Sequence, residues 1–327
     1  MMDFLRNPGR LFMPVENRSY RIIIWVTGVY SLLVSLIPLF RFVPRPPLQL
    51  GIWLVCYLLY RLRPIPDSLR RWIFYLFLFV TYPALRNVVT SYAASFHCAD
   101  VIAAERWLFG CLPSYSLQML LNPEGRLLWF DYVFAILHST IFWLPVIISA
   151  VVLRARGPAR MRRVSVAVTI LSLAGYLTYI LYPVTPPWMA SLEGMAPPMS
   201  RVVFNALGRI VPGDVAGTFQ PSPRGAMPSL HAGVPILILL VSLREFGRKA
   251  AWVSIPVAVI IFEIVYGAEH YVVDVLAGVV YAVAAYLLVY RLLFPGGRGR
   301  EGRGGRRGRG GNAFCKCQKA GGKETGR

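Results

Sequence analysis

Residues 250–294 read AAWVSIPVAVIIFEIVYGAEHYVVDVLAGVVYAVAAYLLVYRLLF. They contain two apolar runs, 250–267 and 275–294. A helix of about 20 apolar residues is long enough to cross the hydrocarbon core of a bilayer. Three side chains that can carry a charge near neutral pH, Glu269, His270 and Asp274, lie between the runs. This stretch predicts two membrane-spanning helices with a polar connection, and therefore an all-α integral membrane protein.

Further apolar stretches extend the pattern over most of the chain. Four have full spanning length and two are shorter: residues 22–40, 72–92, 127–153 and 164–182, and residues 48–60 and 229–243. Hydrophobic residues make up 56% of the chain and charged residues only 15%, which argues against a soluble globular protein. We therefore predict a helical bundle of six core helices plus about two extra transmembrane helices.

Basic residues are distributed unevenly between the two sides of this predicted bundle. With eight spans, 27 of the 35 Lys and Arg residues fall on the side of the N-terminus. Loops rich in Lys and Arg remain in the cytoplasm, so both termini are predicted to be cytoplasmic. The predicted organisation is a cytoplasmic N-terminal segment (1–20), a polytopic membrane domain (21–294) and a disordered basic Gly/Arg-rich tail (295–327).

The net charge of +20 thus mainly indicates how the protein is oriented in the membrane. Arg-Gly repeats in the tail are also found in RNA-binding segments, but attachment to anionic lipid or simple solvation explains them without a nucleic-acid partner. On the opposite side, residues 95–126 are amphipathic and residues 183–228 form a predicted long loop. Cys98 and Cys111 both fall on that side and could form a disulfide in an oxidising compartment.

The first candidate site is the sequence RGAMPSLHAG, residues 224–233. Ser229 is a predicted N-cap, and the free N–H groups and positive dipole end of a helix N-terminus favour a bound phosphate. His231 would stand in the first helical turn, within reach of that anion. Arg224 could clamp the phosphate with two hydrogen bonds, and Gly233 would allow another helix to approach closely.

The second candidate site pairs His270 with Asp274. Four residues separate them, so on a helix they would share one face. A carboxylate on one imidazole nitrogen fixes the tautomer and leaves the other nitrogen as a nucleophile. Two alternatives remain open. His231 and His270 could be structural histidines at helix ends, or they could bind a metal with Asp274, although no third ligand is obvious.

Together, PSLHAG and the later HYVVD resemble the second and third signatures of the type 2 phosphatidic acid phosphatase superfamily. The resemblance implies a helical core like that of vanadium haloperoxidases and a phosphotransfer site with neither metal nor cofactor. It implies that His270 is a nucleophile forming a phosphohistidine, that Asp274 orients it and that His231 is the general acid. Ser229 and Gly233 match phosphate-site positions.

The chain also departs from the superfamily pattern. The first signature, which requires a lysine, is absent, because no lysine falls on the side of the two histidines. The Ser-Arg pair that usually begins the third signature is replaced by Glu263 and Ile264. Other cations must then bind the phosphate. The candidates on that side are Arg224, Arg86 and Arg201.

Two further segments resemble the inositol phosphorylceramide synthase-like branch of the superfamily. They are YPVTPPW at 182–188 and ERWLFGCLP at 105–113. The Pro-Pro-Trp motif could instead be an interfacial anchor, since Trp favours that layer. Asp131 and His138, seven residues apart, are interpreted as a pair that packs within the bundle, and Glu263 either tunes the site or faces water.

These observations predict a membrane phosphoesterase with its active site on the extracytoplasmic face of the cell membrane. Its substrate would be a lipid phosphate, a polyprenyl diphosphate or a phospholipid. One alternative is a phospho-headgroup transferase, of the inositol phosphate type, that uses a lipid or alcohol acceptor. A second is a lipid transporter or scramblase that keeps the fold without the chemistry. The sequence leaves the oligomeric state open.

Overall fold

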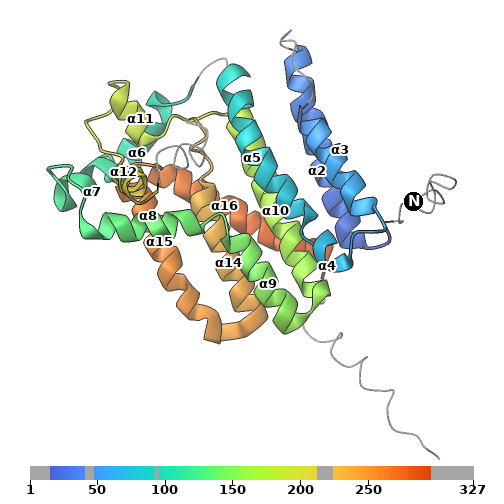
Figure 1. Ribbon diagram of the computed structural model, residues 1–327. Coiled ribbons are helices and arrows are strands. Elements are labelled where there is room, and N and C mark those ends of the chain that lie inside the picture. Colours follow the sequence, from blue (N-terminus) through green and yellow to red (C-terminus); the bar gives the residue numbers. More distant parts are fainter. Residues whose placement is uncertain (1–14, 41–47, 93–95, 212–223, 296–327) are drawn as a thin grey trace, which may run out of the picture.

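The described part of the chain is almost entirely helical. The computed structural model describes residues 15–40, 48–92, 96–211 and 224–295 (Figure 1). The helices in order are α2 (Arg18–Phe40), α3 (Leu48–Arg61), α4 (Asp67–Arg70), α5 (Ile73–Tyr92), α6 (Ala99–Phe109), α7 (Pro113–Leu121), α8 (Trp129–Thr140), α9 (Leu144–Arg156), α10 (Pro158–Leu181), α11 (Pro187–Leu192), α12 (Val202–Ile210), α14 (Leu230–Phe246), the 3₁₀-helix η2 (Gly247–Val253), α15 (Ser254–Tyr266), α16 (Val272–Leu287) and the π-helix η3 (Leu288–Leu293). Most of the N-terminal segment and of the basic tail lies outside the described residues.

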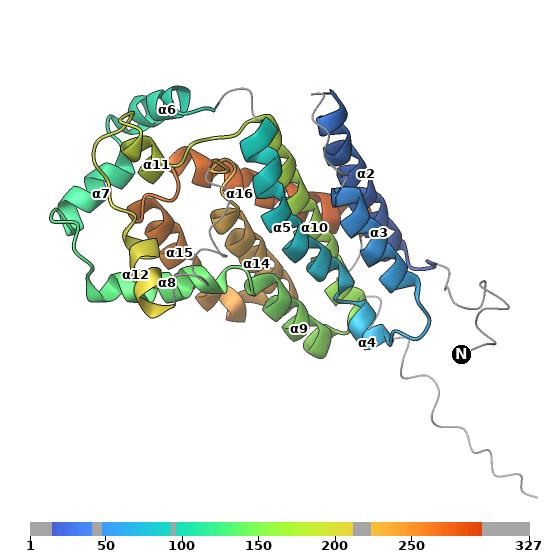
Figure 2. The same cartoon turned by 45° about the horizontal axis from the view of Figure 1, so that its top comes forward.

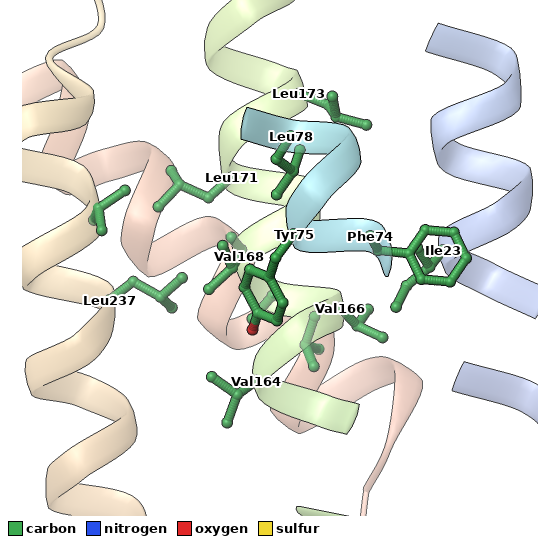
Figure 3. Close-up of a cluster of buried hydrophobic side chains, with 14 of the residues drawn as sticks. Ile23, Phe74, Tyr75, Leu78, Val164, Val166, Val168, Leu171, Leu173 and Leu237 are labelled. Atoms are coloured by element: carbon green, nitrogen blue, oxygen red, sulfur yellow. The ribbon is translucent and has the colours of Figure 1, made fainter. Parts of the chain in front are cut away.

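Helix α10 lies at the centre of the bundle and contacts α2, α5, α9, α14 and α16. Its side chains are apolar around most of its circumference, which is typical of a helix buried on every side. Figure 3 shows Val164, Val168 and Leu171 of α10 in one cluster with Tyr75 of α5 and Leu237 of α14. This packing fixes the position of α14, which carries His231.

Helices α14 and α16 approach each other most closely at two glycines. A Cβ atom added to Gly278 would lie 2.2 Å from the carbonyl oxygen of Ser229, and one added to Gly233 would lie 3.0 Å from the carbonyl oxygen of Gly278. Small residues allow membrane helices to pack backbone against backbone. The close approach predicted at Gly233 is therefore confirmed, and it brings the first turns of the two helices together.

The predicted all-α membrane bundle is confirmed, whereas the count of eight spans stays a prediction. Among the described residues, four helical segments are long and apolar enough to cross a membrane, or five if the bent α8–α9 pair is one span. One of the four, Leu230–Tyr266, turns back at η2, so that α14 and α15 pack against each other (Figure 1).

Two predicted elements differ in the structure. The span expected over 127–153 is broken into α8 and α9, which meet at 60°. Pro145 stands at the start of α9, where its missing N–H costs no helical hydrogen bond. The loop expected over 183–228 contains two short helices, α11 and α12, in its described part. Together with α6 and α7 they lie at one end of the bundle (Figure 2).

The arginine-rich end of the bundle is opposite the end that carries the two histidines. Glu245, near the end of α14, pairs with Arg160 at 3.0 Å near the start of α10. Arg156 donates a hydrogen bond to the Glu245 carbonyl oxygen. Since His231 stands in the first turn of α14, the length of that helix separates it from these arginines.

Candidate active site

Ser229 caps α14 as the sequence predicted. Its Oγ accepts a hydrogen bond from the backbone N–H of Ala232 (3.2 Å), and the helix begins at Leu230. The backbone N–H of Ser229 donates to the Asp274 carbonyl oxygen (2.9 Å), which ties the start of α14 to α16. His231 therefore stands in the first turn at a fixed point beside α16.

His270 lies in the connection before α16, which begins at Val272, so the expectation that His270 and Asp274 share one helical face was wrong. Asp274 caps α16 instead: its Oδ2 accepts a hydrogen bond from the backbone N–H of Tyr271 (2.9 Å). The same oxygen lies 3.6 Å from Nδ1 of His270. The carboxylate thus faces the imidazole at ion-pair distance, because the cap brings the chain back over the helix start.

The two histidines of the two signatures meet directly. Nδ1 of His231 lies 2.9 Å from Nε2 of His270, and both side chains are buried. This contact fits the tautomer in which His270 carries its proton on Nδ1, toward Asp274, and accepts from His231 at Nε2. The nitrogen lone pair used in that hydrogen bond is the one a nucleophilic His270 would use to attack.

His138 contacts the same site, in a way that the sequence did not reveal. Its Nδ1 lies 2.9 Å from Oε1 of Glu263 on α15, and its ring lies 4.7 Å from that of His231, centroid to centroid. The suggested pairing of His138 with Asp131 is wrong, because Oδ2 of Asp131 accepts from the backbone N–H of Leu128 and caps α8. Glu263 is buried rather than facing water.

Arg201 is placed beside the nucleophile candidate through Glu269, the residue before His270. Its Nε and Nη2 donate to the two carboxylate oxygens of Glu269 at 2.7 and 2.9 Å. The guanidinium also lies over the rings of Trp188 (4.3 Å) and Phe204 (3.6 Å). Trp188 of the Pro-Pro-Trp motif thus contacts Arg201, and its backbone N–H donates to the Ala268 carbonyl oxygen.

The other two predicted phosphate-binding arginines are not joined to the histidines by any contact described. Arg224 donates to Oε1 of Glu193 (2.7 Å) and to Oγ1 of Thr185 (3.2 Å), and it lies over Phe96. Arg86 belongs to a part of α5 whose side chains are outside the described residues. Of Arg201 and Arg224, Arg201 is the one that binds Glu269, the residue next to His270.

Glu105 of the branch-like segment 105–113 and Gln118 of α7 support the site from outside. Oε1 of Glu105 accepts a hydrogen bond from the backbone N–H of Val273 (2.8 Å), so it caps the start of α16. Burial raises the pKa of the Glu105 carboxyl to about 7. Gln118 binds the backbone of Ser200 and the carbonyl oxygen of Tyr266. Glu105 and Gln118 thus connect α6 and α7 to the chain on either side of His270.

Two further expectations concern cysteines and metals. Cys98 and Cys111 are both free, and Cys98 is buried whereas Cys111 is exposed, so the suggested disulfide is absent. Among the described residues, no group of three or more His, Cys, Asp or Glu side chains is arranged to hold a metal ion.

The geometry accords with the comparison of the sequence with known families. A family model described as PAP2 superfamily matches residues 100–288, more than half of the chain. The chain belongs to the PAP2 superfamily. The matched range contains all four residues of the histidine cluster, namely His138, His231, Glu263 and His270, as well as Asp274.

Two curated relatives lie in the branch suggested by the sequence. The chain is 29% identical over 169 residues to the inositol phosphorylceramide synthase of Candida albicans, covering 49% of this chain and 35% of the relative. It is 25% identical over 240 residues to the inositol phosphorylceramide synthase catalytic subunit aur1 of Schizosaccharomyces pombe, covering 66% and 55%. The chain thus matches about a third and about half of the length of these relatives. No solved structure matches it. Family and relatives indicate a membrane enzyme that modifies a lipid phosphoester.

Proposed function

We propose that this protein cleaves a lipid phosphoester through a covalent phosphohistidine at His270. The observation that carries the proposal is the buried 2.9 Å contact between Nε2 of His270 and Nδ1 of His231, beside the Asp274 carboxylate. This arrangement supplies a nucleophilic nitrogen, a group that orients it and a proton donor within reach of the same phosphorus.

The reaction has two balanced steps. In the first, Nε2 of His270 forms a bond to phosphorus, the bond from phosphorus to the lipid oxygen breaks, and protonated His231 gives its proton to that oxygen. In the second, a hydroxyl oxygen attacks phosphorus while His231 takes its proton, and the N–P bond breaks. The N–H groups at the start of α14 and the Arg201 guanidinium stabilise charge on the remaining phosphoryl oxygens. No step requires a metal ion.

The distribution of charge supports an active site on the extracytoplasmic face of the membrane. Arginines lie near the start of α10 and the end of α14, away from His231. Arginine-rich ends of membrane helices remain in the cytoplasm. The active site is therefore on the extracytoplasmic side, where the headgroup of an outer-leaflet lipid is accessible. A lipid phosphate, a polyprenyl diphosphate and a phospholipid all present such a phosphate.

A second candidate function differs only in the acceptor of the second step. Both named relatives are inositol phosphorylceramide synthases, and that name describes a phosphoinositol headgroup attached to a ceramide. An alcohol in place of water would make this protein a headgroup transferase, with a phosphoinositol lipid as donor.

The test is mass spectrometry of lipids incubated with the purified protein in detergent. One set receives a short-chain lipid phosphate, and another receives phosphatidylinositol with and without a ceramide or long-chain alcohol. Free phosphate indicates the phosphoesterase, and a new phospho-headgroup lipid indicates the transferase. Absence of both products, with folded protein in every condition, would overturn both and favour a transporter or scramblase. His270→Ala is the negative control.

A further inference from the structure

A third buried histidine, His138, lies behind the candidate general acid His231. Its ring is 4.7 Å from the ring of His231, and the two ring planes are inclined by 30°. Phe204 packs against the ring of His138 edge-on, at 5.2 Å and 73°. His138 is therefore buried between His231 and Phe204 of α12.

Glu263 fixes the orientation of His138. Its Oε1 lies 2.9 Å from Nδ1 of His138, and the side chains are 0% and 3% exposed, respectively. A hydrogen bond between buried, polar groups is strongly orienting because water cannot compete for either partner. In the described part of the chain, neither Nε2 of His138 nor Oε2 of Glu263 has a further hydrogen-bond partner. The contact with Glu263 is thus what holds the His138 ring in place.

His231 is in turn confined by rings on more than one side. His138 covers one face, and Phe142 meets the ring at 88° and 5.9 Å. With the ring confined in this way, Nδ1 of His231 points at Nε2 of His270. A general acid loses much of its effect when its nitrogen is misdirected, because proton transfer requires hydrogen-bond geometry.

We propose that His138, anchored by Glu263, is a positioning residue for His231. The proposal rests on the proposed function of His231 as the proton donor in the first step. His138 and Glu263 touch neither phosphorus nor the departing oxygen in this account. They act by keeping one orientation of the His231 ring, so their loss impairs the proton transfer rather than the attack by His270.

Leaving-group dependence distinguishes this role from a merely structural one. The departing alkoxide of a short-chain lipid phosphate needs a proton, whereas 4-nitrophenolate departs without one. We expect His138→Phe to slow release of the lipid alcohol by roughly 100-fold, the lower range of general acid catalysis, and release of 4-nitrophenol by less than about 5-fold. Equal losses on the two esters would overturn the proposal.

Conservative variants and a matched control complete this test. His138→Gln and Glu263→Gln each retain a hydrogen-bonding group, so each should keep more alkyl-ester activity than the corresponding alanine variant. His97 is the control, because it forms another His–carboxylate pair, with Asp100 at 2.6 Å, outside the histidine cluster. We expect His97→Phe to leave the ratio of the two rates unchanged. An altered ratio in His97→Phe, or no difference between the Gln and Ala variants, contradicts the positioning role.

A measurement without substrate separates this inference from the proposed function. In ¹⁵N-histidine-labelled protein in detergent, the ring N–H of His231, assigned with His231→Asn, should exchange slowly with water. We expect fast exchange in His138→Ala and in Glu263→Ala, with unchanged helical circular dichroism. Slow exchange in both variants overturns the positioning role even if the enzyme is active. If the His231 ring N–H exchanges fast in both variants but the wild-type protein transforms no lipid, the proposed function is overturned and the positioning role is not.

Discussion

Nδ1 of His231 lies 2.9 Å from Nε2 of His270, although 39 residues separate them in the chain. The contact exists because the N-terminal turns of α14 and α16 pack closely at Gly233 and Gly278. A resting hydrogen bond between the two histidines means that the phosphoryl group must enter between them.

Replacing the nucleophile candidate should abolish the first chemical step. We expect His270→Ala to lower turnover by at least about 10³-fold, because it removes the proposed nucleophile, and Asp274→Asn to lower it by roughly 10²–10⁴-fold. The phosphoenzyme trapped from ³²P-labelled substrate should disappear in His270→Ala. Full activity in a folded His270→Ala protein would exclude the mechanism.

The glycine contact between α14 and α16 should not tolerate a methyl group. A Cβ on Gly278 would lie 2.2 Å from the Ser229 carbonyl oxygen, so Gly278→Ala must separate the two helices. We expect a loss of stability of about 1–3 kcal/mol and a large loss of turnover, because the histidines also separate. Gly51→Ala is the matched control, since its Cβ would meet nothing within 4 Å. Similar melting temperatures for the two variants in detergent contradict this account.

Glu105 should make stability depend on pH. Its pKa rises from 4.5 to about 7 in the folded protein, mainly because it is buried. The folded state then holds the proton more tightly than the unfolded state, so stability falls as the pH rises from about 4.5 to about 7, by roughly 3 kcal/mol. Glu105→Gln removes this titration and keeps an oxygen for the Val273 N–H.

The measurement for Glu105 is thermal unfolding of both proteins in detergent. The melting temperature of Glu105→Gln minus that of the wild type should be larger at pH 8 than at pH 5. The same difference at both pH values would show that Glu105 does not titrate in this range.

Arg201 should be sensitive to the loss of its planar guanidinium. The Arg201→Lys variant keeps the positive charge. It loses the two parallel hydrogen bonds to Glu269 and the stacking on Phe204. We expect about a 10-fold or greater fall in kcat/KM. The control is Arg209→Lys, an exposed position on the same helix, α12. Equal kinetics for both lysine variants would remove Arg201 from the site.

Removal of metal ions should leave turnover unchanged. The proposed steps use only His231, His270, Asp274 and cationic or N–H groups of the protein. We expect the EDTA-treated and dialysed enzyme to retain its full rate on a short-chain lipid phosphate. A loss that is restored by adding one divalent cation would favour the metal-ligand alternative for the two histidines.

Much of the site could be predicted from local sequence. The Ser229 cap depends on residues that neighbour it in the chain, and the close approach at Gly233 depends on the absence of a side chain there. Short motifs therefore specify both features. The sequence also predicted that Asp274 lies close to His270, but the predicted cause, a shared helical face, was wrong. The two residues lie close through the cap at Tyr271 and not through a shared helical face, because α16 begins only at Val272.

The amino-acid sequence by itself determined the all-α membrane class and the superfamily, because apolar length and two short motifs are local properties of the chain. Only the tertiary structure decided which distant polar groups became partners. His138 pairs with Glu263, 125 residues away, and not with Asp131 on its own helix. Arg201 pairs with Glu269, 68 residues away. A buried polar group must find a partner wherever packing provides one. The packing of α8 against α15, and the contact of Arg201 at the start of α12 with the connection before α16, are not encoded in any single segment.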